Sequence, residues 1–338
     1  MSLDASFTDE QLALRDVARD LFAEASGPDR LRARWAAETY DPATWKQLAS
    51  VGLTGVGIDE ELGGQGGSPA DLVLVAEEAG AACLPDPLVE TLFVAAPSVA
   101  DTTWRQRIAA GDALVRVQQR GAPFVLDADV VDALIAGRRD ESGYEVFLVE
   151  RDGIRVGRRV PSEDGTRRLF EADIDLDGAV SLGPADPVRA RIFAGTALEL
   201  VGLCRQLVDM CVEHVTVRKQ FDVPVGSFQA VQHALANMYV ELESARGAAR
   251  HAGRLVSADA TDPDALHAAH VAKAAAGRAH RLINRDALQL HGGIGFTWEH
   301  DLHLWLKRGN ALAASFGDDT GHRAMLAVRL LAHRPADG

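Results

Sequence analysis

Over about the first 112 residues, hydrophobic positions recur at the spacing of helices. Thr8 and Gln11 form the pattern of a capping box, in which each side chain accepts a hydrogen bond from the backbone N–H of the other residue. Leu14, Val17 and Leu21 fall on one stripe at helical spacing, as the buried face of a helix requires. We therefore predict an N-terminal helical domain over residues 1–112.

After residue 112 the pattern changes to short runs rich in β-branched and aromatic residues, separated by turn residues. The polar segment Arg138–Gly143 is typical of a hairpin connection. The runs that predict strands are 114–117, 130–135, 144–149, 154–156 and 172–176. These runs predict a small β domain over residues 113–183.

Helical spacing returns after Gly183–Pro184 and continues toward the end of the sequence. The predicted helices are 187–219, 227–256, 263–290 and 301–333. The first two are long enough to pack side by side in a bundle. The sequence thus predicts a mainly α protein with a small β middle domain, in which residues 184–338 form a C-terminal four-helix bundle.

Composition and charge narrow the functional classes. The 338 residues are 47% hydrophobic and 25% charged, which is ordinary for a folded protein of two or three domains. Asp and Glu outnumber Lys and Arg by 49 to 35, which gives a formal net charge of −14, so a nucleic-acid partner is not expected. No apolar stretch approaches the length of a membrane span, and the acidic start of the chain is unlike a signal peptide. We expect no membrane partner and a cytoplasmic location.

Two stretches carry candidate chemistry: RKQFDVPVGSFQ begins at Arg218, and QLHGGIGFT begins at Gln289. Arg218 offers a fork of N–H donors suited to a phosphate, while Phe221 and Phe228 flank a turn where a planar ring could lie. The segment Gly292–Gly295 lets backbone N–H groups approach an anion without interference from a Cβ atom. Each feature has a common alternative, because an arginine can cap a helix dipole and glycines can end a helix.

Together, in this order along the chain, the two stretches closely resemble those of the acyl-CoA dehydrogenase family, and the likeness extends over nearly the whole chain. The resemblance implies FAD as cofactor and an acyl-CoA thioester as substrate, which is desaturated at its α and β carbons while a glutamate removes the α-proton. It also implies that these stretches hold the ADP half of an FAD whose flavin end lies in the neighbouring subunit. The positions that match the family's contacts are Arg218, Gln220, Phe221, Phe228, Gln289, Gly292 and Gly293.

The middle domain departs from the family's pattern. Family members carry a threonine–glutamate–proline stretch followed by glycine and serine, and then a tryptophan–isoleucine–threonine strand, which together hold the flavin ring. The matching region here reads VRVQQRGA over residues 115–122, and neither motif has a counterpart. We therefore expect that this chain does not seat a flavin ring by itself in the usual way.

The family's catalytic glutamate also lacks a counterpart. Counting from the glycine pair, its usual position is Phe316, and the family's alternative position falls near Ile192. A phenylalanine cannot remove a proton from a thioester. Glu199 lies seven residues beyond Ile192 on the same helical face and is the candidate for a replacement base. The alternative interpretation of Glu199 is a buried or interface carboxylate paired with an arginine such as Arg189 or Arg205.

No metal site is predicted. His300 and His303 lie three positions apart beside acidic residues, but related bacterial acyl-CoA dehydrogenases carry a similar string at a subunit contact, which accounts for it. Cys83, Cys204 and Cys211 include no CxxC pair and are interpreted as small core residues.

Three hypotheses accommodate both the match and the departures. In the first, the chain is the subunit that lacks the catalytic glutamate in a heteromeric acyl-CoA dehydrogenase. Its partner would be a full-length homologue, in an α2β2 assembly of the kind that acts on fatty-acid or bulky steroid side-chain thioesters. In the second, the chain is a self-sufficient homo-oligomer that uses Glu199 or another acid as base. In the third, it is a non-catalytic interaction or scaffold protein that keeps the fold. For either enzyme, the resemblance implies electron-transfer flavoprotein or a similar acceptor as a further partner.

Overall fold

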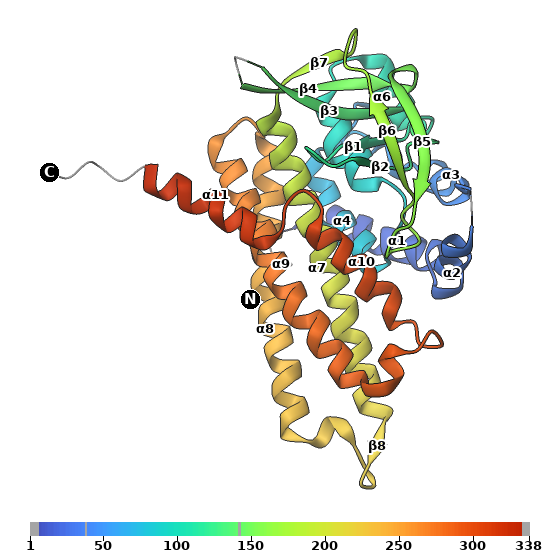
Figure 1. Cartoon of the computed structure of the whole chain (residues 1–338), viewed down its shortest axis with the longest axis vertical. Coiled ribbons are helices and arrows are strands. Elements are labelled where there is room, and N and C mark those ends of the chain that lie inside the picture. Colours follow the sequence, from blue (N-terminus) through green and yellow to red (C-terminus); the bar gives the residue numbers. More distant parts are fainter. Residues whose placement is uncertain (1–6, 38, 141–142, 333–338) are drawn as a thin grey trace, which may run out of the picture.

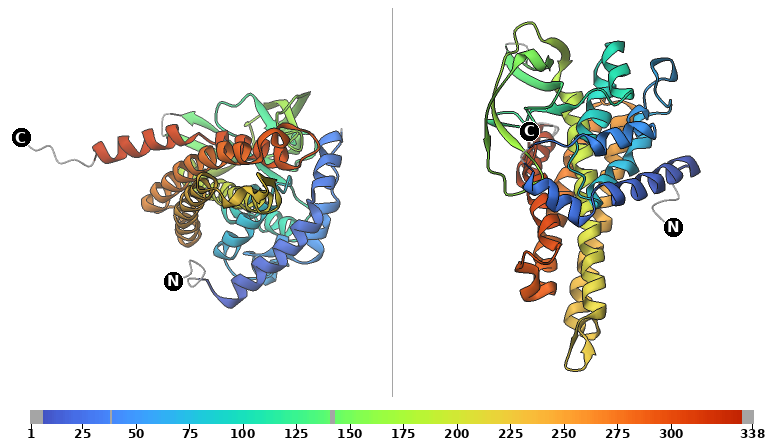
Figure 2. Two further views of the ribbon diagram at one scale, coloured as in Figure 1. Left: turned by 90° about the horizontal axis from the view of Figure 1, so that it is seen from below. Right: turned by 90° about the vertical axis from the view of Figure 1, so that its right-hand side faces the viewer.

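The computed structural model describes residues 7–37, 39–140 and 143–332. Long helices of the C-terminal part run along the longest axis of the molecule (Figure 1). The strands lie across one end of these helices, and the N-terminal helices pack beside the strands against the same end (Figure 2). The predicted fold class, mainly α with a small β part, is confirmed.

The N-terminal part consists of short helices around one buried helix. Its helices are α1 (Asp9–Ala25), α2 (Pro28–Ala36), α3 (Ala43–Ser50), α4 (Leu72–Ala81), the π-helical segment η5 (Val89–Ala95), α5 (Ala96–Ser98) and α6 (Thr102–Ala109). The predicted capping box at the start of α1 is confirmed, because the side chains of Thr8 and Gln11 each accept a hydrogen bond of 3.2 Å from the other's backbone N–H. Every residue of α4 is buried, so this helix forms the centre of the N-terminal part.

Helix α4 packs directly against α7 (Ala185–Val217), the first helix of the C-terminal bundle. Glycines permit this approach: a Cβ atom on Gly80 would lie 1.8 Å from the backbone O of Glu199, and one on Gly202 would lie 1.7 Å from the backbone O of Glu77. Any side chain at either glycine would therefore force the two helices apart. The N-terminal helices and the bundle consequently share one hydrophobic core.

The strands form two small sheets. They are β1 (Val115–Val117), β2 (Phe124–Leu126), β3 (Ala133–Asp140), β4 (Gly143–Glu150), β5 (Ile154–Val160), β6 (Leu169–Ile174) and β7 (Val180–Pro184). One sheet has the order β1-β3-β4-β7, in which only β1 and β3 are parallel, and the other has the antiparallel order β2-β6-β5. The predicted hairpin between β3 and β4 is confirmed. Strands β2 and β7 were not predicted, because both are short, with one buried residue in β2 and none in β7, which leaves a weak hydrophobic signal.

The C-terminal part contains α7, α8 (Gln229–Ala258), α9 (Pro263–His291), α10 (Leu302–Ala314) and α11 (Asp319–Ala332). A two-stranded hairpin, β8 (Lys219–Gln220) and β9 (Val223–Pro224), connects α7 to α8 at the outer end of the bundle. Helix α9 packs extensively against both α7 and α8. The three cysteines are free and buried, as predicted.

The prediction of one helix over 301–333 is wrong. The chain breaks between α10 and α11, in a linker over residues 315–318. Phe316 has a φ of +58° and Gly317 a φ of +102°, and neither value is compatible with a right-handed helix. The sequence does carry a signal of the break, because residues 317–323 include no hydrophobic residue and Gly317 is followed by two aspartates, which are typical of a helix end and a new helix start. Asp318 caps the new helix, since its Oδ1 accepts a hydrogen bond from the backbone N–H of Gly321 at 2.8 Å.

Candidate functional site

The hairpin at the outer end of the bundle holds the first predicted motif. Arg218 follows the last residue of α7 and is exposed, and its N–H donates to the backbone O of His214 at 2.9 Å. Phe221 and Asp222 form the two-residue turn, with φ values of +53° and +66°. Two consecutive positive φ values suit a tight hairpin turn, yet a bulky side chain rarely adopts them, because its Cβ crowds the backbone. Such an outlier is a reason to look for a function of Phe221.

The aromatic rings of this hairpin are exposed. The Phe221 side chain is 88% exposed, and its ring meets that of Phe228 edge to face, with 6.3 Å between the ring centres. Gln220 is exposed beside them. Exposed aromatic rings are unfavourable in water unless a ligand or a partner covers them.

The second predicted motif lies at the end of α9. Gly292 has a φ of +60° and a ψ of −141°, a conformation essentially restricted to glycine. A Cβ atom at Gly292 or Gly293 would meet nothing within 4 Å, so the backbone of this turn is open to a ligand. Gln289, one turn earlier, is exposed as well.

Histidines connect the two motifs. His214 precedes Arg218 by one helical turn, His291 directly precedes Gly292, and the two imidazole rings stack with their centres 4.5 Å apart. The fold thus brings the ends of α7 and α9, and with them both predicted motifs, to the outer end of the bundle.

A third imidazole, that of His300, joins this pair, and one ring nitrogen from each of the three lies within 4.8 Å of the others. Burial lowers the pKa of His291 to about 4 and also lowers the pKa of His214. This set of three is not the pair His300 and His303 that lies three positions apart in the sequence. His303 Nδ1 instead contacts the backbone O of His300 at 2.8 Å. The expectation that the chain holds no metal stays a prediction.

The region that would match the family's flavin site lies where the segment after β1 meets the α10–α11 linker. The backbone N–H of Phe316 donates to Gln119 Oε1 at 2.7 Å. Both residues line a cavity of about 170 Å³ on one side and a cavity of about 260 Å³ on the other. Gln119 and Phe316 therefore form a shared wall between two small spaces where a three-ring flavin would need one continuous slot.

Phe316 and Ile192, the two positions where the family places its base, line the smaller cavity together. No carboxylate from the part of the chain that the structure describes lines this cavity. Its polar residues are Gln118, Gln119, Arg120, Tyr144 and Arg189. The two positions that the resemblance assigns to the base thus face one space, and neither side chain can accept a proton.

A buried lysine binds the end of α10 and the α10–α11 linker through backbone carbonyl groups. Lys273 Nζ, on α9, donates to the backbone O atoms of Leu312, Ala313 and Gly317 at 3.0–3.2 Å. These carbonyls would otherwise lack partners at the end of α10. Burial lowers the pKa of Lys273 to about 8. Sequence analysis missed this residue, because a single lysine among alanines on a helix gives no sign that it is buried.

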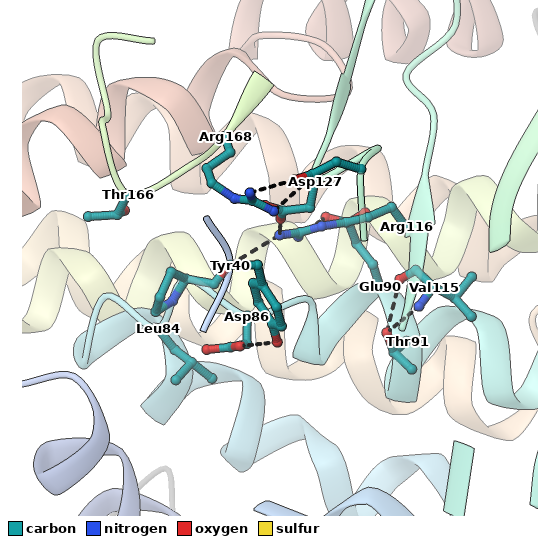
Figure 3. Close-up of polar contacts among 12 residues, drawn as sticks. Tyr40, Leu84, Asp86, Glu90, Thr91, Val115, Arg116, Asp127, Thr166 and Arg168 are labelled. Carbon is teal, nitrogen blue, oxygen red and sulfur yellow. Dashed lines mark hydrogen bonds and ion pairs between the residues drawn. The ribbon is translucent and has the colours of Figure 1, made fainter. Parts of the chain in front are cut away.

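A buried network of charges lies where β1 and its neighbouring segments meet η5, a region that we call the junction (Figure 3). Arg116, on β1, donates to Glu90 Oε1 at 2.8 Å and also contacts Asp127. Arg168 reaches Asp127 at 3.2 Å and both carboxylate oxygens of Asp129 at 2.7 Å. The network joins η5 to the β layer and was not predicted. The one available signal was an arginine inside the apolar run Leu114–Val117.

Glu199 is half-buried on α7 and does not pair with either predicted arginine. Arg189 pairs with Asp186, and Arg205 pairs with Glu78. The two arginines named for Glu199 are therefore wrong, because both point to other acids. The guanidinium with the largest electrostatic effect on Glu199 is that of Arg167. Burial raises the pKa of Glu199 to about 7.

Comparison with known proteins identifies the family. The model of the acyl-CoA dehydrogenase N-terminal domain matches residues 8–106, and that of the C-terminal domain matches residues 191–331. The chain is 32% identical over 315 residues to acyl-CoA dehydrogenase IpdE2 of Mycolicibacterium smegmatis, a match that covers 92% of this chain and 95% of that protein. The chain therefore belongs to the acyl-CoA dehydrogenase family, whose members are oxidoreductases that act on CH–CH groups. The resemblance found in the sequence is confirmed.

Solved structures show the same fold. A chain of the ChsE4–ChsE5 complex from Mycobacterium tuberculosis superposes with a TM-score of 0.87 at 22% identity, and the match covers 99% of this chain and 100% of that one. The Tcur3481–Tcur3483 steroid ACAD gives a TM-score of 0.85 at 26% identity, with coverage of 96% and 98%. In the described part of this chain, every helix is too short or too polar to span a membrane.

Proposed function

We propose that this chain is the subunit without a catalytic carboxylate in a heteromeric, FAD-dependent acyl-CoA dehydrogenase, which desaturates a thioester between its α and β carbons. The observation that carries the proposal is the pair Phe316 and Ile192 in one cavity that no described carboxylate lines. Removal of a weakly acidic α-proton needs a carboxylate within hydrogen-bond reach. The partner subunit, a full-length homologue, would supply that carboxylate and seat the flavin ring.

This chain would contribute the contacts to the ADP half of the cofactor. The open turn at Gly292 and Gly293 leaves backbone N–H groups free for the diphosphate, and Arg218 adds a charged donor at the same end of the bundle. Phe221 and Phe228 offer exposed rings against which adenine could stack. Gln220 and Gln289 lie exposed beside these residues as hydrogen-bonding groups. FAD, when bound, supplies the acceptor for the hydride that leaves the β carbon.

Two comparisons support a heteromer. The matched chain with the TM-score of 0.87 comes from a complex named for two proteins, ChsE4 and ChsE5. The steroid ACAD is likewise named for two proteins, Tcur3481 and Tcur3483. We infer a similar pairing here, with a bulky acyl-CoA such as a steroid side-chain thioester as substrate and electron-transfer flavoprotein or a similar protein as acceptor. We further propose that residues 1–112, 113–183 and 184–338 act as three domains and that the assembly is cytoplasmic.

The test is the ratio of FAD to protein, measured by visible absorbance, for the chain alone and for the chain co-expressed with a full-length homologue from the same genome. We expect a colourless lone chain and a yellow complex with one FAD for each pair of subunits. Stoichiometric FAD in the lone chain, or a full-length homologue that never co-purifies, would overturn the proposal.

A matched pair of variants shows which surface is used. Arg218→Gln should weaken FAD binding by the complex about 10- to 100-fold, because it removes a charge-assisted contact worth roughly 1.5–3 kcal/mol. Arg158→Gln is the control, since Arg158 is equally a surface arginine but lies on β5 and pairs with Glu171. Equal FAD affinity in both variants would mean that the outer end of the bundle does not hold the cofactor.

A second candidate function rests on Glu199. Its raised pKa of about 7 is suited to a general base at neutral pH, as a self-sufficient homo-oligomer would require. In that case the purified chain alone would oxidise acyl-CoA, and Glu199→Gln would abolish the activity.

A further inference from the structure

One buried arginine near the α10–α11 linker differs from its neighbours because it forms no ion pair with an acid of the described residues, although Asp164, Glu90 and Glu199 are near enough to act on it electrostatically. Arg308 pairs with Asp164, and Arg116 pairs with Glu90 and Asp127. Arg167, which is 9% exposed, has no carboxylate within ion-pair distance among the residues that the structure describes. Its hydrogen bond is a long one, from Nη1 to Ser315 Oγ at 3.4 Å.

An arginine in this situation is costly to the folded chain. A buried ion that lacks a partner loses its hydration without the compensating attraction of an opposite charge. Two further guanidinium groups, those of Arg308 and Arg116, stand near Arg167 and add repulsion, which the carboxylates of Asp164 and Glu90 offset only in part. Burial first, and then these two cations, lower the pKa of Arg167. The attraction of nearby acids therefore does not compensate for the burial of this cation, and an anion beside Arg167 would stabilise it.

The side chain of Arg167 does not face a packed core. It lines the cavity of about 260 Å³ between the β layer and the α10–α11 linker. Gln118, Ser162 and Ser315 place further hydrogen-bonding groups on the wall, while Phe124 and Leu169 make other parts of it apolar. No carboxylate of the described residues lines this cavity.

We propose that Arg167 and this cavity form a binding site for a small organic monocarboxylate. The carboxylate of the ligand would accept hydrogen bonds from the guanidinium, whose planar fork matches it, and the short apolar part would lie against Phe124 and Leu169. The mixture of one buried cation, a few hydroxyl and amide groups and apolar walls is typical of small-molecule sites. The site depends on the proposed function only in that no flavin ring fills this cavity.

The experiment uses the full chain and compares sodium butyrate with butyramide, a neutral ligand of nearly the same shape. Butyrate should raise the thermal unfolding midpoint saturably, by roughly 2–4 °C at a large excess over its dissociation constant. Butyramide and sodium chloride at the same concentrations should not. A midpoint that responds equally to butyrate and butyramide, or to neither, would overturn the proposal without any variant.

Two variants then assign the site. Arg167→Met should remove the butyrate response and, in the absence of ligand, leave the unfolding midpoint unchanged or higher, because it removes an unpaired buried cation. Arg308→Met is the matched control and should lower the midpoint, because it leaves Asp164 without its partner. An Arg167→Met chain that keeps the butyrate response would exclude Arg167 as the receptor. FAD content is measured separately on the complex, so a failure here leaves the proposed function standing.

Discussion

The outer end of the bundle exposes its polar and aromatic groups, whereas the junction beneath the β layer buries them. At the outer end, Phe221 is 88% exposed and the turn at Gly292 and Gly293 faces open space. At the junction, Arg116 and Glu90 are buried and bonded to each other. The first region is incomplete without something to cover it, whereas the second is largely closed by its own residues. The two regions therefore differ in how far their own residues cover and pair their polar and aromatic groups.

The largest effect should come from opening the junction. Arg116→Met removes the partner of two buried carboxylates, Glu90 and Asp127, and should lower the free energy of unfolding by about 3–5 kcal/mol. Urea unfolding monitored by circular dichroism measures this loss of unfolding free energy. The control is Arg155→Met on the exposed face of β5, where the ion pairs at 3.4 Å are open to solvent and the loss should stay below about 1 kcal/mol. If both variants lost the same amount, the junction would not be the closed region that we describe.

At the outer end, stability and binding should respond in opposite directions. Asparagine tolerates positive φ better than phenylalanine, so Phe221→Asn should leave the free energy of unfolding unchanged or raise it by up to about 1 kcal/mol. The same change should raise the dissociation constant of FAD from the complex about tenfold, since a stacked ring contributes roughly 1–3 kcal/mol. Fluorescence titration of FAD and urea unfolding measure the two effects. A variant that loses stability and keeps FAD would show that Phe221 serves the fold.

Acid should weaken the packing around the α10–α11 linker through a pair of histidines. His322 Nε2 contacts the backbone O of Phe316 at 3.2 Å, and its Nδ1 lies 2.8 Å from His270 Nδ1. Burial lowers both pKa values to about 4. In the unfolded chain a histidine titrates near 6.5, so the pair contributes stability above that pH and loses it as the pH falls toward 4. We expect a loss of about 1 kcal/mol between pH 6.5 and 5.5 after allowing for solvent screening.

The urea midpoint across that pH range tests the assignment. His322→Gln should make the dependence shallower without removing it, because burial also lowers the pKa of His280 and that of His291 to about 4. His233→Gln, at an exposed position on α8, should leave it unchanged. Glu199 acts in the opposite direction, because its raised pKa contributes stability that is lost as the pH rises from about 4.5 to about 7. A steeper loss on acidification in Glu199→Gln would therefore agree with this assignment, and an unchanged slope in His322→Gln would contradict it.

The sequence was informative where function depends on local pattern. The hairpin and the glycine turn are each read from a few consecutive residues, and helical spacing predicted the long helices that bring them together. The break at Phe316 and Gly317 was missed although the apolar spacing lapses over residues 317–323. The positive φ of Phe316 is the part of the break that apolar spacing does not encode.

Buried charge was the least predictable feature. Arg116, Arg167 and Lys273 lie far along the chain from the groups that they contact or face, so no short motif announces them. Arg116 and Lys273 are single charged residues among apolar ones, whereas Arg167 stands in the polar stretch 162–168 and resembles a surface residue. Only the packing of β1, α9 and the linker distinguishes the two cases.

The smallest expected effect separates the two candidate functions. Under the proposed heteromer, Glu199→Gln should leave the turnover of the complex within about twofold, because Glu199 does not line the cavity that Phe316 and Ile192 share. The raised pKa of Glu199 then reflects burial on α7 next to α4, where Gly80 allows the two backbones to meet. The turnover is measured as steady-state oxidation of an acyl-CoA by the complex with an artificial electron acceptor. The positive control is the change of the partner's catalytic glutamate to glutamine. Loss of most activity in the Glu199 variant, with intact FAD content, would transfer the base to this chain, and the closed junction would then have to open during turnover.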